Sequence, residues 1–157
     1  MKVTIYGAGA IGGHLGAMMC RAGHDVSLIA RGAHLDAIRR DGLLLTGNGG
    51  DHLIKPALAT DDPGEIGPVD AVLFCVKLYD VEAAAESIRP LLHAETMVIS
   101  VMNGVDGPDR IAAVLGARHV LGGAAYASAV IESPGVVSYK STMASLVIGE
   151  LDGTVSA

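Results

Sequence analysis

The chain has 157 residues, of which 50% are hydrophobic and 18% charged, and these proportions favour one compact globular domain over a disordered chain. The formal net charge is −6 and the 11 basic residues are scattered, which argues against a nucleic-acid partner because contacting phosphates requires clustered Lys and Arg. There is no apolar stretch of membrane-spanning length and no signal peptide, so we expect a cytoplasmic protein without a membrane partner.

The first half of the chain alternates short apolar runs with segments of helical periodicity. In chain order, this pattern predicts a strand at 2–6, a helix at 10–22, a strand at 25–30, a helix at 32–40, and a hairpin of 43–45 with 52–55. Residues 60–68 are rich in Asp, Gly and Pro and predict a loop. The first strand–helix–strand unit has the size of a βαβ crossover, in which the two strands are parallel.

The second half continues the same alternation. It predicts a strand at 71–76, a helix capped by Asp80 and running to about Leu92, a strand at 96–101, a helix from Pro108 to Gly116, and β-like stretches at 120–130, 136–139 and 146–149. The scarcity of aromatic residues fits a sheet filled by small and branched aliphatic side chains. We therefore expect one α/β domain over residues 1–157, with a Rossmann-type, doubly wound, mainly parallel sheet and helices on both faces.

The two cysteines and six histidines do not form a recognisable metal site. Cys20 and Cys75 both lie in apolar stretches, which favours two buried, reduced thiols; a disulfide between them is the alternative. The histidines have no metal-ligand spacing with Cys or acidic residues, so surface or supporting roles are expected and no metal is predicted.

The segment Gly7-Ala8-Gly9-Ala10-Ile11-Gly12, the phosphate loop, connects the first predicted strand to the first helix. In this context, Gly7 permits the tight turn, Gly9 lets the backbone approach a pyrophosphate, and Gly12 lets the helix pack closely on the sheet. Unpaired amides at the helix start attract phosphate, and the helix dipole adds to this attraction. The loop therefore predicts dinucleotide binding; a glycine-rich turn without a ligand is the alternative.

The end of the second predicted strand indicates which dinucleotide is bound. NAD-selective domains place Asp or Glu there to bind the ribose hydroxyls, whereas this strand ends with Arg31 and has no carboxylate. A guanidinium can bind a 2′-phosphate through two hydrogen bonds, so Arg31 predicts NADP. The alternative is a solvated surface arginine, which is also the interpretation of Arg39 and Arg40 further along the predicted helix.

Several motifs in order along the chain, together with the phosphate loop, resemble ketopantoate reductases. These motifs are Arg31-Gly32 with His34-Leu35 behind it, Val76-Lys77, Met102-Asn103-Gly104-Val105, Pro134-Gly135-Val136-Val137 and Gly149-Glu150-Leu151-Asp152-Gly153. Such enzymes reduce ketopantoate (2-dehydropantoate) to pantoate with NADPH, on the pathway to pantothenate and coenzyme A. Broader members of the family reduce other 2-oxo acids. The resemblance therefore implies an oxidoreductase with a small 2-oxo acid substrate.

The resemblance also implies roles for three further residues. Lys77 corresponds to a lysine that contacts the cofactor near the ribose and nicotinamide, although a solvated loop lysine is the alternative. Asn103 corresponds to a residue that contacts both cofactor and substrate; an ordinary Asn-Gly turn is the alternative. Ser128 falls where the family has another cofactor contact.

The family's second, helical C-terminal domain is expected to be absent from this chain. In the family, that domain supplies the general-acid lysine, much of the substrate-carboxylate site and the dimer contacts. None of the four lysines here, Lys2, Lys55, Lys77 and Lys140, matches the general acid. We therefore expect the chain to bind NADP but to reduce little by itself, and homo-oligomerisation is possible. The alternatives are a domain of another NADP-dependent 2-hydroxy-acid dehydrogenase and a non-catalytic nucleotide-sensing module.

Overall fold

The computed structural model describes the backbone of residues 1–77 and 81–154, and their side chains apart from those of 141–144. The helices are α1 (Ala10–Arg21), α2 (Gly32–Asp41), α3 (Val81–Ser87) and α4 (Gly107–Leu115). The strands are β1 (Lys2–Tyr6), β2 (Asp25–Ile29), β3 (Leu43–Gly47), β4 (His52–Ile54), β5 (Leu58–Thr60), β6 (Ala71–Phe74), β7 (Met97–Ser100), β8 (Val120–Ser133) and β9 (Val136–Glu150). None of the described helices is long and apolar enough to cross a membrane.

The described strands form one sheet in the order β4-β3-β9-β8-β7-β6-β1-β2-β5. Its centre is parallel: Val3 of β1 pairs with Val26 of β2 on one side and with Ala71 of β6 on the other. The chain leaves β1 first toward β2 and later returns on the opposite side through β6 and β7. The order of strands therefore reverses at β1, which is where open α/β sheets bind ligands beyond the carboxyl ends of their strands.

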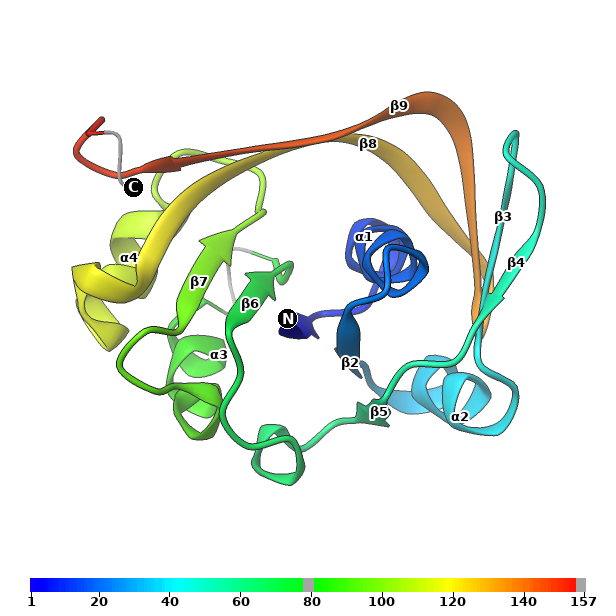
Figure 1. The fold of residues 1–157 in the computed structure, drawn as a ribbon, viewed down its shortest axis with the longest axis horizontal. Helices are drawn as coiled ribbons and strands as arrows, with labels where there is room; N and C mark the ends of the chain where they lie inside the picture. The colour runs from blue at the N-terminus through cyan, green and yellow to red at the C-terminus, as the bar shows by residue number, and fades with distance from the viewer. Residues whose placement is uncertain (78–80, 155–157) are drawn as a thin grey trace.

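Two hydrophobic cores lie on the two faces of the sheet, because alternate residues of each strand point to opposite sides. In β1, Val3 and Ile5 belong to the core that includes Leu15 of α1, whereas Tyr6 belongs to the core shared with α3 and α4. Figure 1 shows α1 on one side of the central strands, and α3 and α4 on the other. The prediction of a Rossmann-type α/β sheet with helices on both faces is confirmed.

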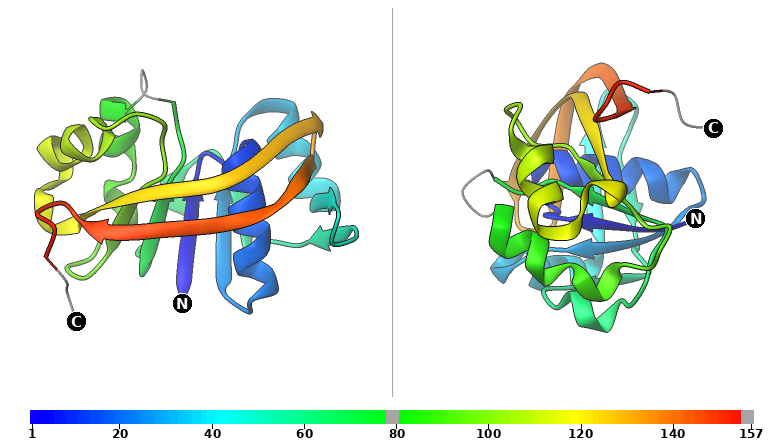
Figure 2. Two further views of the ribbon diagram at one scale, coloured as in Figure 1. Left: turned by 90° about the horizontal axis from the view of Figure 1, so that it is seen from above. Right: turned by 90° about the vertical axis from the view of Figure 1, so that its left-hand side faces the viewer.

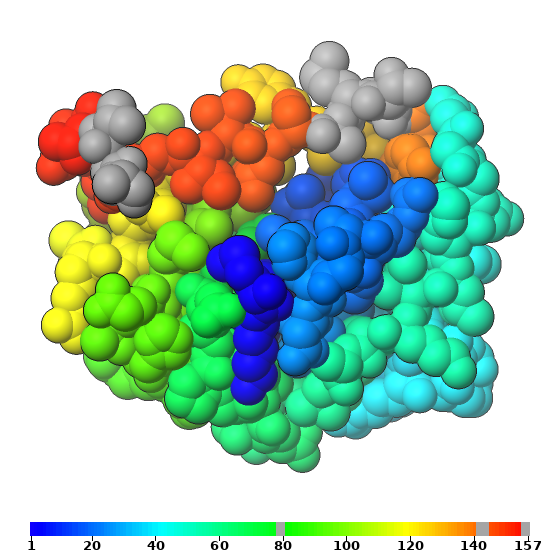
Figure 3. Space-filling model, viewed as in Figure 1, coloured from blue at the N-terminus to red at the C-terminus, as the bar shows by residue number. Residues whose placement is uncertain are grey.

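The strands β8 and β9 form a long antiparallel ribbon that crosses over α1 (Figure 2). Both strands pack against α1, and β9 also pairs in parallel with β3, so the sheet curls around this helix. In the space-filling view, β9 runs along the upper rim with α1 below it (Figure 3). The predicted break between 136–139 and 146–149 was wrong, since β9 is continuous over Val136–Glu150. Pairing with β8 along most of its length supplies the hydrogen bonds that the local sequence does not signal.

Two further boundaries differ from the prediction. The strand β5 was missed because it has only three residues; it pairs with the end of β2, as in the match of Leu28 with Ala59. The helix expected to reach Leu92 ends at Ser87 and is followed by a 3₁₀ turn. Pro90 lies in that turn, and a proline cannot donate the backbone hydrogen bond that an α-helix needs. The predicted cap residue, Asp80, lies outside the described residues.

Candidate functional site

The phosphate loop is held against the end of β2. The amides of Gly7 and Ala8 both donate to the carbonyl oxygen of Ile29, at 3.2 and 2.8 Å. Gly7 has φ +96°, which favours glycine, and a Cβ placed there would lie 2.9 Å from the carbonyl oxygen of Cys75 on the adjacent chain segment. Backbone contacts on two sides therefore define the path of the chain from β1 into α1.

Gly9 and Gly12 have different surroundings, although both belong to the loop motif. A Cβ on Gly12 would overlap the carbonyl oxygen of Gly7, so the start of α1 comes too close to the loop for any side chain. A Cβ on Gly9 would meet no heavy atom within 4 Å, so the space beside Gly9 is open. Gly12 therefore allows the close packing predicted for it, whereas the approach of a pyrophosphate to Gly9 stays a prediction.

The start of α1 is suited to bind an anion. Its first backbone hydrogen bond runs from the amide of Gly13 to the carbonyl of Gly9, at 2.7 Å, and the preceding amides have no intrahelical acceptor. The first turn of α1 contains no acidic residue. The helix dipole adds a partial positive charge at this end, so a phosphate group would be favoured there.

A cavity of about 550 Å³ borders this loop at the reversal point of the sheet. The carboxyl ends of β1 and β2 and residues 75–77, which follow β6, contribute to it, together with α2, α3 and β8. Arg31 and Lys77 are its charged lining residues, and both are exposed. The full lining consists of residues 6–9, 29–31 and 75–77 with His34, Ala83, Ala84, Ser87 and Ile131, none of which is acidic. The lining of the cavity therefore combines the backbone of the phosphate loop with two cationic side chains.

Arg31 lies at the N-cap of α2 and is separated from the end of β2 by Ala30. His34, one turn into the helix, faces the phosphate loop: its Nε2 lies 3.0 Å from the carbonyl oxygen of Ala8. Its Nδ1 lies 3.0 Å from the amide of Gly135, which can only donate. Nδ1 must therefore be the acceptor and Nε2–H the donor, which is the neutral imidazole. Partial burial lowers the pKa of His34, which is consistent with the neutral form.

The opposite wall of the cavity is built around Tyr6, which sequence reasoning did not identify. The Tyr6 ring stacks on Phe74 with 5.5 Å between centroids, and its hydroxyl lies 2.6 Å from Oγ of Ser87. Because Ser87 donates to the carbonyl of Ala84, the tyrosine hydroxyl donates to Ser87. This pairing joins the carboxyl end of β1 to α3 across 81 residues of sequence, so no local pattern could have indicated it.

The remaining predicted residues lie in α1, after β7 and in β8. Ala10, Ile11 and Gly12 form the first turn of α1. Asn103 follows β7 and is exposed, while Ser128 is an exposed residue of β8. Neither of these two is among the lining residues of the cavity, so their roles stay predictions.

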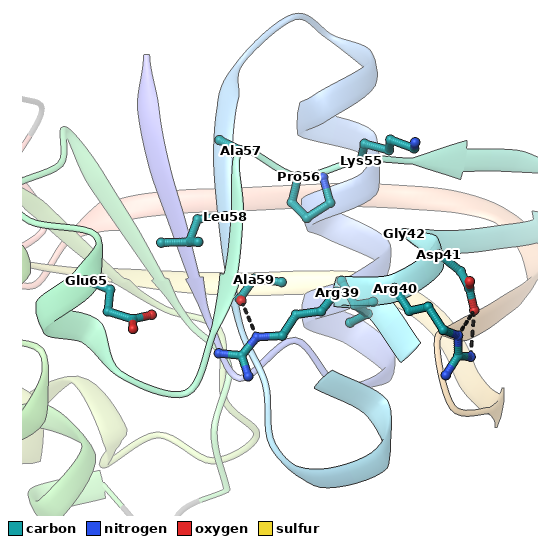
Figure 4. Close-up of a pocket in the computed structure, with 11 residues that line it drawn as sticks. Arg39, Arg40, Asp41, Gly42, Lys55, Pro56, Ala57, Leu58, Ala59 and Glu65 are labelled. Carbon is teal, nitrogen blue, oxygen red and sulfur yellow. Dashed lines mark hydrogen bonds and ion pairs between the residues drawn. The ribbon is translucent and has the colours of Figure 1, made fainter. Parts of the chain in front are cut away.

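A second cavity, of about 470 Å³, lies between the end of α2 and the segment leading into β5 (Figure 4). Its basic side chains point apart instead of converging on one ligand. Arg40 pairs with Asp41 at 2.6 Å, and Nε of Arg39 donates to the carbonyl of Ala59 at 2.9 Å. The prediction that these arginines form a solvated helix face holds for Arg40, whereas Arg39 also ties α2 to the edge strand.

The described residues contain no group of three or more His, Cys, Asp or Glu that could hold a metal ion. Cys20 and Cys75 are free and partly buried against the core around α1, so the disulfide alternative is not formed. Burial raises the pKa of the Cys75 thiol to about 12. Neither thiol is therefore poised as a nucleophile at neutral pH.

Comparison with known proteins identifies a family and several relatives with a similar fold. The ketopantoate reductase PanE/ApbA family matches residues 3–153. A 2-dehydropantoate 2-reductase from Mesorhizobium japonicum is 36% identical, over 88% of this chain and 49% of the relative. The crystal structure of 2-dehydropantoate 2-reductase from Porphyromonas gingivalis superposes with a TM-score of 0.90 at 37% identity, over 96% of this chain and 55% of that one.

A structure of D-mandelate dehydrogenase with NADH and anilino(oxo)acetate is also similar, with a TM-score of 0.86 and 27% identity. The match covers 96% of this chain and 49% of that protein. The chain thus spans about half the length of the relatives it matches.

Proposed function

Since the chain belongs to the ketopantoate reductase PanE/ApbA family, we propose that it binds a nicotinamide dinucleotide in the cavity beside the phosphate loop. The observation that carries this proposal is the open space at Gly9, next to the unpaired amides that begin α1. The residues present fit the pyrophosphate of such a cofactor, because Gly12 and Gly7 bring backbone close and Gly9 leaves the approach clear.

The dinucleotide proposed is NADP. Arg31 is the exposed cation at the end of β2, where an NAD-selective domain would have a carboxylate, and the lining residues of the cavity include no acid to repel a 2′-phosphate. Lys77, after β6, is proposed to contact the ribose and nicotinamide end. Asn103 and Ser128 are proposed as further contacts, with Asn103 also facing the substrate.

The reaction proposed for the whole protein is the reduction of 2-dehydropantoate to pantoate. The cofactor would supply the hydride, while residues of this chain bind the phosphates and orient the nicotinamide toward the keto acid. No lysine of the chain matches the general acid, and the chain spans about half of its relatives. We therefore propose dinucleotide binding, and not complete reduction, as the activity of these 157 residues. The proposed location is the cytoplasm, where the two free thiols would stay reduced.

A different 2-oxo acid is the second candidate substrate. It is favoured by the similarity to D-mandelate dehydrogenase, whose structure contains NADH and anilino(oxo)acetate. The structure of that relative holds NADH, whereas NADP is proposed here, so the preference of this chain between NADPH and NADH is decided by titration. A purely nucleotide-sensing module finds no comparable support, because the relatives described above are named as reductases or dehydrogenases.

The cofactor proposal is tested by titrating NADPH and NADH into the chain and into Arg31→Ala, with binding followed by nicotinamide fluorescence. Wild type should bind NADPH more tightly. Arg31→Ala should weaken NADPH binding by about tenfold or more, as expected for one hydrogen-bonded charge, and change NADH binding little. Arg40→Ala is the matched control, because Arg40 pairs with Asp41 and does not line the cavity. Tighter NADH binding, or an unchanged preference in Arg31→Ala, would refute NADP; binding of neither would refute the dinucleotide.

A further inference from the structure

His34 connects two parts of the molecule that are 101 residues apart in sequence. Its Nε2–H donates to the carbonyl oxygen of Ala8 in the phosphate loop, at 3.0 Å. Its Nδ1 accepts from the amide of Gly135, at 3.0 Å, in the turn between β8 and β9. Both ring nitrogens therefore have backbone partners, and exchanging the proton between them would lose both bonds.

The turn that holds His34 is itself closely packed. Gly135 has φ +78°, and a Cβ there would lie 2.9 Å from the Cβ of Ala37 on α2. The carbonyl of Gly135 accepts from the amide of Leu44 at 2.8 Å, which joins the turn to β3. The amide of Gly135, which donates to Nδ1 of His34, thus belongs to a backbone segment that cannot easily move. No charged residue occurs in the turn Pro134–Gly135 or in the phosphate loop.

The bond to Ala8 acts on the peptide at the centre of the phosphate loop. Because a peptide bond is planar and trans, the carbonyl of Ala8 and the amide N–H of Gly9 point in opposite directions within one plane. Ala8 is also held from its other side, since its own amide donates to Ile29 at 2.8 Å. Fixing the carbonyl therefore fixes the direction of the Gly9 amide, and a hydrogen bond to the carbonyl polarises that amide as a donor.

We propose that His34 is a positioning residue of the phosphate loop: it fixes the Ala8–Gly9 peptide in the orientation that presents the Gly9 amide to a bound phosphate. This inference rests on the proposed dinucleotide binding. It gives a role to His34, which lines the cavity, and to the Pro134–Gly135 turn, which bonds His34. Neither belongs to the glycine motif. The imidazole acts through the backbone and makes no contact with the reacting atoms.

The inference predicts opposite results for two substitutions of His34. His34→Ala removes the donor and should weaken NADPH binding by about tenfold, the factor that corresponds to one net hydrogen bond. His34→Gln keeps an N–H donor and a carbonyl acceptor on one side chain and should restore affinity to within about threefold of wild type. His52→Ala and His52→Gln are matched controls, since His52 also bonds a backbone carbonyl, that of Gly49, but lies outside the cavity.

A second measurement uses NMR of the ligand-free chain. In wild type, the His34 nitrogens should show the Nε2–H tautomer, and the Gly9 amide should be as ordered as α1. In His34→Ala, the Gly9 amide should shift and become more mobile, whereas His34→Gln should retain the wild-type values. Equal NADPH affinity in all variants, or a Gly9 amide unaffected by His34→Ala, would overturn the inference. If wild type binds no NADPH, the proposed function fails. The NMR shift and mobility of the Gly9 amide in His34→Ala still show whether His34 orders the loop.

Discussion

Replacing the second and third glycines of the phosphate loop, Gly9 and Gly12, with alanine should separate fold stability from ligand binding. In Gly12→Ala, the new Cβ would overlap the carbonyl oxygen of Gly7 and lie 3.0 Å from Cγ2 of Ile5. The Gly7 carbonyl cannot retreat freely, because the amides of Gly7 and Ala8 are bonded to Ile29. Overpacking of this kind costs about 1–3 kcal/mol, and contact with backbone places Gly12→Ala at the upper end.

Gly9→Ala should have the opposite effect. Its Cβ would meet no atom of the protein within 4 Å, and the φ of Gly9, −75°, suits alanine, so that only its ψ of −149° would have to relax toward the β region. The free energy of unfolding should change by no more than about 1 kcal/mol, the range for replacing a helix N-cap glycine. NADPH binding should weaken by more than about tenfold, because the Cβ occupies the space proposed for the pyrophosphate.

The assay pairs urea unfolding, followed by far-UV circular dichroism, with fluorescence titration of NADPH. The expected pattern is a large loss of stability in Gly12→Ala and a selective loss of binding in Gly9→Ala. A Gly12→Ala variant as stable as wild type would refute the close packing inferred at the start of α1. A Gly9→Ala variant that binds NADPH normally would refute the position proposed for the phosphates.

Two other predictions concern buried titratable groups. His14 is buried beside Tyr139, and neither of its ring nitrogens bonds to a described residue. Burial lowers the pKa of His14 from 6.5, so the unfolded chain takes up a proton that the folded chain excludes as the pH falls below about 6.5. Stability from this group is therefore lost on acidification, and His14→Leu should make the urea midpoint less pH-dependent between about pH 7.5 and 5.5; an unchanged slope would contradict this. Cys75, with a thiol pKa of about 12, should react with iodoacetamide at least about tenfold more slowly in the native chain than in urea, as measured by mass spectrometry; equal rates would contradict its burial.

The phosphate loop and the central strands could be predicted because their signals are local. Gly7 and Gly9 lie between β1 and α1, and Gly12 lies in the first turn of α1. Continuous apolar runs such as Ala71–Phe74 are typical of parallel strands buried on both faces. The position of Arg31 followed directly from the end of β2. These features depend on residues that are close together in the sequence, so a local pattern is enough to predict them.

The features that sequence reasoning missed depend on contacts between distant segments. His34 had no metal-ligand spacing and was expected to be a surface or supporting residue, yet it bonds the loop and a turn 101 residues away. Tyr6 meets Ser87 across 81 residues. The edge strand β5 is too short to show a pattern, and Arg39 of α2 supports it through the carbonyl of Ala59. In each case, the contact is a hydrogen bond between segments that are distant in the sequence, which no local pattern indicates.

The central claim is that a nicotinamide dinucleotide binds between the phosphate loop and Arg31. Its most direct test is an NMR titration of the isotopically labelled chain with NADPH, in which shifts of the backbone amides are mapped onto the fold. The account predicts saturable shifts concentrated at residues 7–12, around Arg31 and His34, and at the end of β6. Shifts confined to other regions, such as the second cavity between α2 and β5, or no saturable shift at all, would contradict it.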